Sequence, residues 1–80
     1  MKLCEAKLLY ESGAIFDPRI FIPSSGHGWC LDFQSKKKVT FKLYLEAERG
    51  GRRVFKTSNA AVNACITIGC EQAVVDLSGK

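Results

Sequence analysis

The sequence predicts an α+β fold, with a mostly antiparallel sheet and a helix packed on one of its faces. Apolar residues recur at helical spacing in two segments, one near the start of the chain and one over residues 59–68. Between them, short segments alternate apolar and polar residues and are separated by glycine- and serine-containing turns. The expected order is an N-terminal helix, four strands, a second helix and a last strand, which gives a four- to five-stranded sheet.

The first helix is expected over residues 2–12, where helix-forming residues dominate and Gly13 follows as a natural end. Residues 14–23 are expected to be extended. Asp17 and Pro18 should interrupt this segment with a turn or bulge, because proline lacks an amide hydrogen and pushes the preceding residue out of the helical region.

A loop and a further strand follow. Residues 24–28 contain two serines and two glycines, which predicts a loop. Residues 29–34 alternate, with Trp29, Leu31 and Phe33 on one face. This period of two is typical of a strand with one buried face.

A β-hairpin is expected next. Residues 39–47 alternate in the same way, and Gly50 and Gly51 supply the positive φ angles of a tight turn. A three-residue loop beginning at Gly50 would place Phe55 opposite Ala47 and keep its ring in the core. We therefore expect that register.

The second helix is expected over residues 59–68, with cap candidates from Thr57 to Asn59 and an end at Gly69. It is apolar nearly all round, so the sheet or a partner should cover it well. Residues 72–77 are expected to form the last short strand.

The size and composition indicate one ordinary globular domain. The chain has 80 residues, of which 46% are hydrophobic and 25% charged. No apolar run approaches the ~20 residues of a membrane helix. Charged residues near the start interrupt any signal-peptide hydrophobic region, so we expect a cytoplasmic protein.

No enzymatic function, metal or cofactor is expected. The four cysteines lie in apolar runs and are interpreted as reduced, structural thiols. A zinc site formed by Cys65, Cys70 and His27 is the alternative, but the chain lacks the paired, closely spaced ligands of structural zinc folds. His27 lies in a loop beside Ser24 and Ser25, and no residue can be identified that would orient it as a general base.

Positive charge is concentrated in residues 36–56, where eight Lys and Arg residues against two Glu residues give a net charge of +6. Such a segment is typical of phosphate contact, and aromatic residues on a sheet can stack on bases. This concentration of positive charge therefore predicts that the hairpin binds nucleic acid. The candidate residues are Lys36, Lys37, Lys38, Lys42, Tyr44, Arg49, Arg52, Arg53 and Lys56.

Two other interpretations remain open. Lysines at hairpin edges also protect against aggregation, and the chain's net charge of +4 is ordinary for a soluble protein. A thin core and an apolar second helix also favour a protein partner, such as an acidic protein surface or a second copy in a homodimer.

Two segments carry a resemblance to a known group of proteins. ERGGRRVFKTSNAAVNACITIGCEQAVVDL and the opening EAKLLYESGAI, with Gly28-Trp29 between them, resemble small accessory proteins encoded by plasmids and integrative elements. Those proteins are associated with replication or partition. The resemblance covers most of the chain and implies a mobile-element accessory protein acting beside DNA, with no catalytic residue. The alternative is a small inhibitor of a host protein or nucleoprotein complex, of the anti-CRISPR kind.

Overall fold

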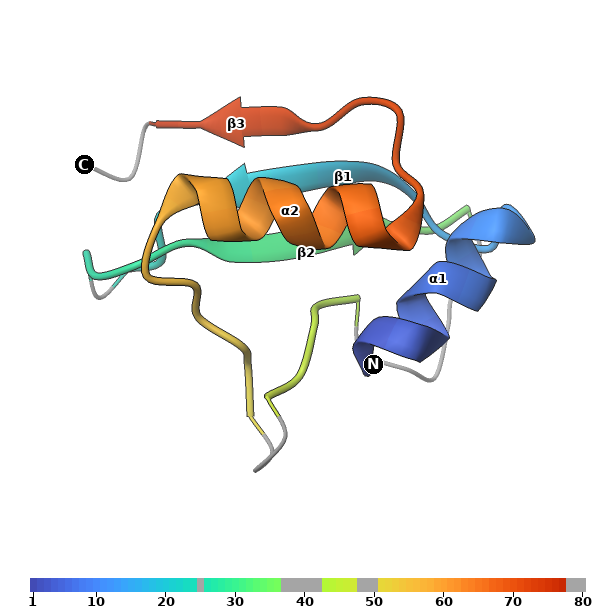
Figure 1. The fold of residues 1–80 in the computed structure, drawn as a ribbon, viewed down its shortest axis with the longest axis horizontal. Coiled ribbons are helices and arrows are strands. Elements are labelled where there is room, and N and C mark those ends of the chain that lie inside the picture. Colours follow the sequence, from blue (N-terminus) through green and yellow to red (C-terminus); the bar gives the residue numbers. More distant parts are fainter. Residues whose placement is uncertain (25, 37–42, 48–50, 78–80) are drawn as a thin grey trace.

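A computed structural model describes residues 1–24, 26–36, 43–47 and 51–77. The elements are α1 (Leu3–Glu11), β1 (Phe16–Phe21), β2 (Cys30–Gln34), α2 (Ser58–Ile68) and β3 (Val74–Asp76) (Figure 1). The α+β class is confirmed, with an N-terminal helix, a sheet, and a second helix that packs on the sheet.

Both helices begin and end close to the residues expected from the sequence. The Glu5 carboxylate accepts a hydrogen bond from the Lys2 amide at the start of α1, at 3.1 Å. At the start of α2 the Thr57 hydroxyl accepts one from the Ala60 amide, also at 3.1 Å. Gly69 ends α2 with φ +101°, a left-handed conformation that glycine adopts without a side-chain clash.

The predicted interruption at Asp17-Pro18 is present in β1. Asp17 has a positive φ of +49°, and the pairing of β1 with β2 shifts between Phe16 and Arg19. The bulge sets the register of the rest of the strand, so that Ile20 pairs with Leu31.

The sheet differs from the one expected. Its described part has three strands in the order β2-β1-β3, with β1 antiparallel to β2 but parallel to β3. The described sheet therefore has fewer strands than the four to five expected, and one of its two strand pairs is parallel. The reason is the path of α2, which crosses the sheet and returns the chain to the end where β1 begins, so that β3 runs in the same direction as β1 (Figure 1).

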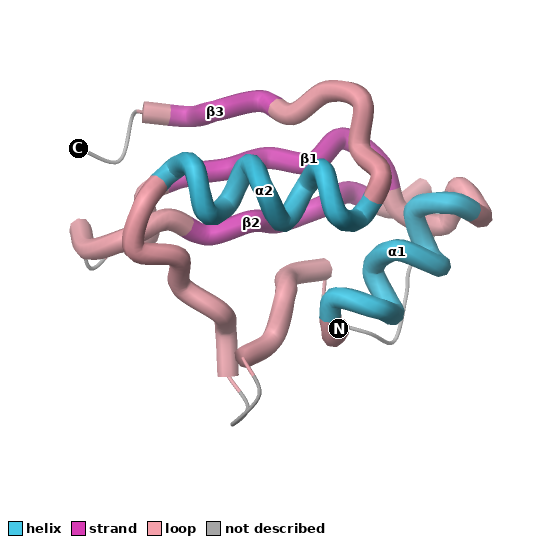
Figure 2. The backbone as a smooth tube through the Cα atoms, in the orientation of Figure 1, coloured by secondary structure: helices cyan, strands magenta, loops and turns pink. Residues whose placement is uncertain are grey.

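The hairpin register also differs from the one expected. Glu46 pairs with Arg52 in a single bridge, and the Ala47 amide donates to the Gly51 carbonyl at 3.0 Å. Phe55 pairs with Trp29 rather than with Ala47, through two backbone hydrogen bonds of 2.8 Å. Its ring is buried because the chain swings across to the start of β2, so the segments flanking the turn are loops with isolated bridges (Figure 2). The expected residues 39–42 lie outside the described part.

The core fills the space between α2, the inner face of the sheet and the start of the chain. Ile15, Ile20, Leu31, Leu45 and Ile68 are its largest fully buried side chains. Leu45 is buried as the strand alternation predicts, so the chain on both sides of the hairpin turn is anchored by one inward side chain, Leu45 before the turn and Phe55 after it.

Candidate nucleic-acid interface

Arg52 lies on the face of the sheet opposite α2 and has three partners within the chain. Its Nη1 atom donates to Oδ1 of Asp32 at 2.7 Å. Its guanidinium carbon lies 4.4 Å from the centre of the Tyr44 ring and 5.4 Å from that of Phe21. A planar guanidinium is suited to pair with a carboxylate while it packs on aromatic rings. Arg52 therefore joins the hairpin to β1 and β2.

Opposing effects of burial and of nearby positive charge act on the Asp32 carboxyl. Burial raises the pKa of the Asp32 carboxyl above its ordinary value, while the charge and hydrogen bond of Arg52 and the charge of Arg19 lower it. Burial has the larger effect, so the pKa stays raised. Loss of Arg52 would leave a half-buried carboxylate with a weaker partner.

The other charges on this outer face are also paired. Arg19 lies 3.5 Å from the Asp76 carboxylate, and its guanidinium carbon lies 5.4 Å from the centre of the Phe21 ring. Arg19 on β1 neighbours Asp32 on β2, which alternates positive and negative groups across the sheet. On the described part of this face, the two arginines are therefore balanced by two aspartates.

Glu46 has a partner that sequence reasoning did not foresee. The N-terminal amine of Met1 donates to the Glu46 carboxylate at 3.0 Å and to the Tyr44 carbonyl at 3.1 Å. The Glu46 amide in turn donates to the Met1 carbonyl at 2.9 Å. This acid of the hairpin is thus neutralised by the chain's own N-terminus.

Arg53 and Lys56 lie elsewhere. Both are exposed, and the Arg53 guanidinium carbon lies 4.8 Å from the centre of the Phe55 ring. Consecutive residues of an extended chain point to opposite sides, which separates Arg53 from its neighbour Arg52. Within the part of the chain that the structure describes, no carboxylate forms an ion pair with Arg53 or Lys56.

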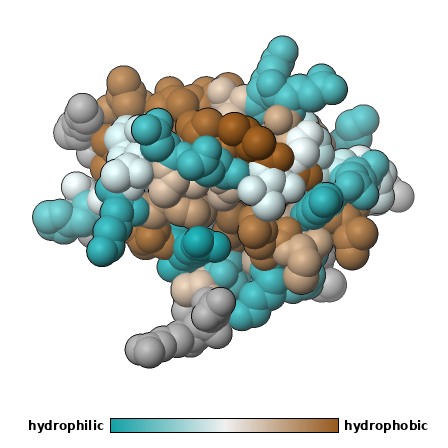
Figure 3. Space-filling model, in the orientation of Figure 1, coloured by the Kyte–Doolittle hydropathy of each residue, from teal (hydrophilic) through white to brown (hydrophobic). Residues whose placement is uncertain are grey.

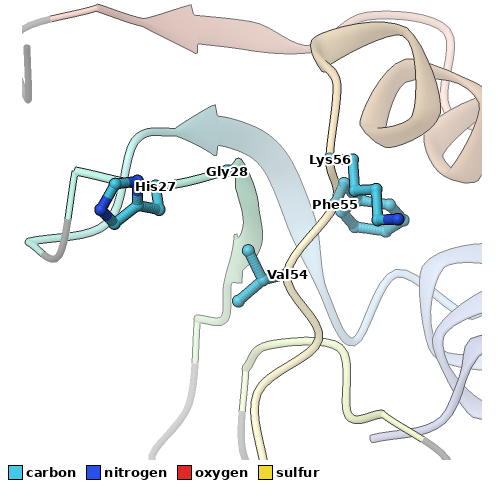
Figure 4. A pocket seen from close by; sticks show the side chains of 5 residues that line it. All are labelled: His27, Gly28, Val54, Phe55 and Lys56. Atoms are coloured by element: carbon cyan, nitrogen blue, oxygen red, sulfur yellow. The ribbon is translucent and has the colours of Figure 1, made fainter.

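Two hollows flank Phe55. One, of about 300 Å³, is lined by His27, Gly28, Val54, Phe55 and Lys56 (Figure 4). The other, of about 310 Å³, is lined by Leu3, Arg53, Phe55 and residues of α2. In Figure 4 the His27 and Lys56 side chains extend to opposite sides of the first hollow, so the two do not form a closed site.

Gly28 allows the loop that contains His27 to lie close to Val54 and Phe55. Its φ is +76°, and a Cβ there would clash with Cγ1 of Val54 and lie 2.8 Å from the Phe55 carbonyl oxygen. Only glycine satisfies both conditions without a shift of the backbone. Gly28 therefore permits the pairing of Trp29 with Phe55 that positions Arg53 and Lys56.

The structure brings some of the sequence-predicted residues together and separates others. Arg52 and Tyr44 contact each other, while Arg53 and Lys56 lie on either side of Phe55 in the sequence. Lys36 is exposed after the end of β2. Four predicted residues lie outside the described part: Lys37, Lys38, Lys42 and Arg49.

Sequence reasoning missed the residues that hold Arg52. Asp32 alternates outward on its predicted strand, which is the one signal that it lies on an open face. Nothing in the sequence links it to Arg52, because the two meet only when the chain after the hairpin turn folds over β2.

The cysteines are all free, with Cys4 exposed and both Cys30 and Cys65 buried. Burial raises the pKa of the Cys65 thiol to about 12, with smaller contributions from Cys70, so this thiol stays protonated at neutral pH. Among the residues described, no three His, Cys, Asp or Glu side chains are grouped so that they could hold a metal ion.

Comparison of the chain with protein-family models, curated proteins and solved structures found no match. The resemblance to mobile-element accessory proteins therefore stays a prediction from the sequence. No helix in the described ranges is both long enough and apolar enough to cross a membrane.

Proposed function

We propose that the chain is a non-enzymatic nucleic-acid-binding protein that contacts phosphates through Arg53 and Lys56, the exposed basic side chains on either side of Phe55. One observation carries this proposal. Among the described residues, the acids nearest to the hairpin are Asp32 and Glu46, which are paired with Arg52 and with the Met1 amine. The positive charge of Arg53 and Lys56 is therefore left for a partner.

The surrounding charge favours an anionic ligand. Residues 36–56 hold eight Lys and Arg residues and two Glu residues, and the whole chain has a net charge of +4. Lys36 adds an exposed charge after β2, and Lys37, Lys38, Lys42 and Arg49 belong to the proposed interface on their sequence position. Nucleic acid gains most from such a segment, because each neutralised phosphate releases condensed counterions.

Arg52 and Tyr44 have a supporting role in this proposal. Their mutual contact and the ion pair with Asp32 hold the hairpin against the sheet. This arrangement fixes the backbone of residue 52 and so directs the next side chain, Arg53, away from the outer face. The expected base stacking by Tyr44 would compete with its contact to the Arg52 guanidinium.

A salt titration with labelled double- and single-stranded DNA tests the proposal. Wild-type affinity should fall steeply with salt, and Arg53→Gln or Lys56→Gln should each reduce the slope of log K against log salt by about 0.9 for duplex DNA. Lys7→Gln is the matched control, since it removes one exposed charge from α1. Its slope should stay at the wild-type value.

Two results would overturn the proposal. One is the absence of binding to either DNA at low salt by the folded protein, which would favour an acidic protein surface as the ligand of the same side chains. The other is an equal loss of slope in Lys7→Gln and Arg53→Gln, which would show attraction to overall charge without a defined site. The mobile-element role implied by the resemblance is compatible with this proposal and adds no residue to it.

A further inference from the structure

A second surface of the molecule is apolar and does not include Arg53 or Lys56. We call it the α2–β3 surface and define it by its exposed side chains on the helix side of the sheet, which are Val62, Ile66, Val75 and Leu77. Ile66 is 64% exposed and Val75 is 46% exposed. Figure 3 shows hydrophobic residues gathered along β3 and the adjoining side of α2. Exposed apolar groups that are contiguous in this way are typical of protein interfaces.

The two sides of α2 differ. Ala60, Asn63 and Thr67 line the hollow beside Leu3. Helical spacing places the exposed Val62 and Ile66 on a different side of α2. The side of α2 that faces the sheet is buried, with Ala61, Ala64, Cys65 and Ile68. No charged residue occurs anywhere in Ser58–Ile68, so this side of α2 presents no charge to a partner.

The two edges of the sheet also differ. The outer edge of β2 is covered, since the Phe33 amide donates to the Leu43 carbonyl at 2.9 Å and Trp29 pairs with Phe55. In the described part of the chain, β3 pairs with β1 alone. A strand that lies at the edge of a sheet and carries valine side chains can pair with another strand.

The register of β3 determines which side chains a new strand would meet. Val75 is beside Ile20, the buried residue that faces α2, so Val75 lies on the same side of the sheet as the helix. Val74 is beside Arg19 and Asp76 is beside Phe21, both on the outer face. The edge is thus apolar beside α2 and carries one acid on the other face.

We propose that two copies of this chain associate by antiparallel pairing of β3 with β3 about Val75. The pairing is self-complementary, as a two-fold interface requires, because Val75 meets Val75 of the second copy. It forms one continuous sheet across both copies. The axis is perpendicular to the sheet, so both α2 helices lie on one face, with Val62 and Ile66 of each turned toward the other.

The charges on the outer face fit this pairing. Antiparallel pairing about Val75 places Asp76 of the second copy opposite Val74, which is itself beside Arg19. Arg19 and that carboxylate are then two strand spacings apart, about 10 Å between Cα atoms, which a long arginine side chain can span. Arg19 is 53% exposed and only 3.5 Å from its own Asp76, so it can be shared between the two acids.

Charge also favours a second copy over another occupant. A chain with a net charge of +4 repels its own copies, and this repulsion is weakest where the surface carries no charge. Because α2 contains no charged residue, it cannot form ion pairs with the acidic or basic groups of another partner. The pairing also leaves Arg53 and Lys56 free, so it is independent of the proposed nucleic-acid contact.

The mass of the full chain in solution tests the dimer. Light scattering over a concentration series should show a species of twice 8.8 kDa for the wild type. Val75→Lys places two lysines opposite each other at the axis and should leave only monomer. Leu8→Lys, at an exposed leucine of α1, is the matched control and should keep the dimer. Circular dichroism confirms that each variant is folded, and Ile66→Lys serves in place of Val75→Lys if the latter unfolds.

A cross-link tests the register. In a Cys4→Ser background, Val75→Cys should give a disulfide-linked dimer on mild oxidation, because directly opposed residues have Cα atoms about 4.5–5.5 Å apart. Leu8→Cys in the same background should give none. A monomeric wild type at every concentration would overturn the proposal. Equal dissociation by Leu8→Lys, or a dimer without the Val75→Cys cross-link, would overturn it as well.

Discussion

The outer face of the sheet and the α2–β3 surface make opposite use of their side chains. On the outer face, Arg19 and Arg52 each pair with an acid and pack on an aromatic ring. On the α2–β3 surface, valine and isoleucine side chains are exposed and no charged residue of α2 accompanies them. A charged residue in the sequence is therefore not necessarily an available charge. The surface most open to a protein partner is the one with the fewest charges.

Adjacent residues repeat this contrast on a smaller scale. Arg52 and Arg53 are equivalent in the sequence, yet Arg52 has a carboxylate and two rings as partners and Arg53 has one ring. The alternation of an extended chain is enough to separate their environments. We therefore expect Arg52 to contribute to stability and Arg53 to binding.

The largest effect is expected at Gly28, on which the position of the Arg52–Arg53 segment depends. Gly28→Ala should lower the free energy of unfolding by about 3 kcal/mol, because a positive φ and a backbone clash both oppose the new methyl group. Chemical denaturation measures it. Gly26→Ala is the matched control, with φ +77° and nothing within 4 Å of the added Cβ, and should cost about 1 kcal/mol. Equal losses in the two variants would show that the close approach to Phe55 is unimportant.

Substitution of the two arginines should separate the two environments. Arg52→Gln should lower the free energy of unfolding by about 1–2 kcal/mol, through loss of the ion pair and the ring contacts. Arg53→Gln should change it by no more than about 0.5 kcal/mol. Denaturation curves under identical conditions measure both. If Arg53→Gln were the more destabilising variant, Arg53 and not Arg52 would be the arginine that stabilises the fold.

The pH dependence of stability tests the pairing of Asp32 with Arg52. Its pKa in the folded protein lies above the ordinary value of 3.8, so its contribution to stability is complete below that pH and is lost as the pH rises through the folded pKa. Arg52→Gln removes a group that lowers this pKa, so the pKa should rise further. Titration of the Asp32 side chain by NMR measures both values. A pKa that falls in Arg52→Gln would contradict the pairing.

The smallest effect on stability is expected on the α2–β3 surface. Val62→Lys should change the free energy of unfolding of the monomer by about 0.5 kcal/mol or less, because the side chain is already exposed. The measurement is thermal or chemical denaturation at a concentration where the protein is monomeric. A loss as large as that of Arg52→Gln would show that this surface is covered within the chain.

The sequence predicts the helices well because the signals for them are local. Thr57 and Gly69 bracket α2 in the sequence as they do in the structure. The mixed sheet could not be predicted in this way, since the pairing of β3 with β1 joins segments more than fifty residues apart. The predicted register of the hairpin was wrong because Phe55 can be buried by pairing either with Ala47 or with Trp29. The structure has the pairing with Trp29, which comes from another segment.

The candidate site was predicted only in part, for the same physical reason. Charge concentration identifies Arg52, Arg53 and Lys56 as candidates, but their partners decide which charges are open. Asp32 and the Met1 amine reach the hairpin through tertiary contacts that no local pattern encodes. The apolar second helix did predict a need for cover, although its exposed side follows only from the packing of its other side against α1.

The most direct test of the central claim compares the salt dependence of DNA binding in Arg52→Gln and Arg53→Gln, at a temperature where both are folded. We expect Arg53→Gln to lower the magnitude of the slope by about 0.9 for duplex DNA and Arg52→Gln to leave it unchanged. An equal reduction in both variants, or a reduction in Arg52→Gln alone, would contradict the division between internal and available charge.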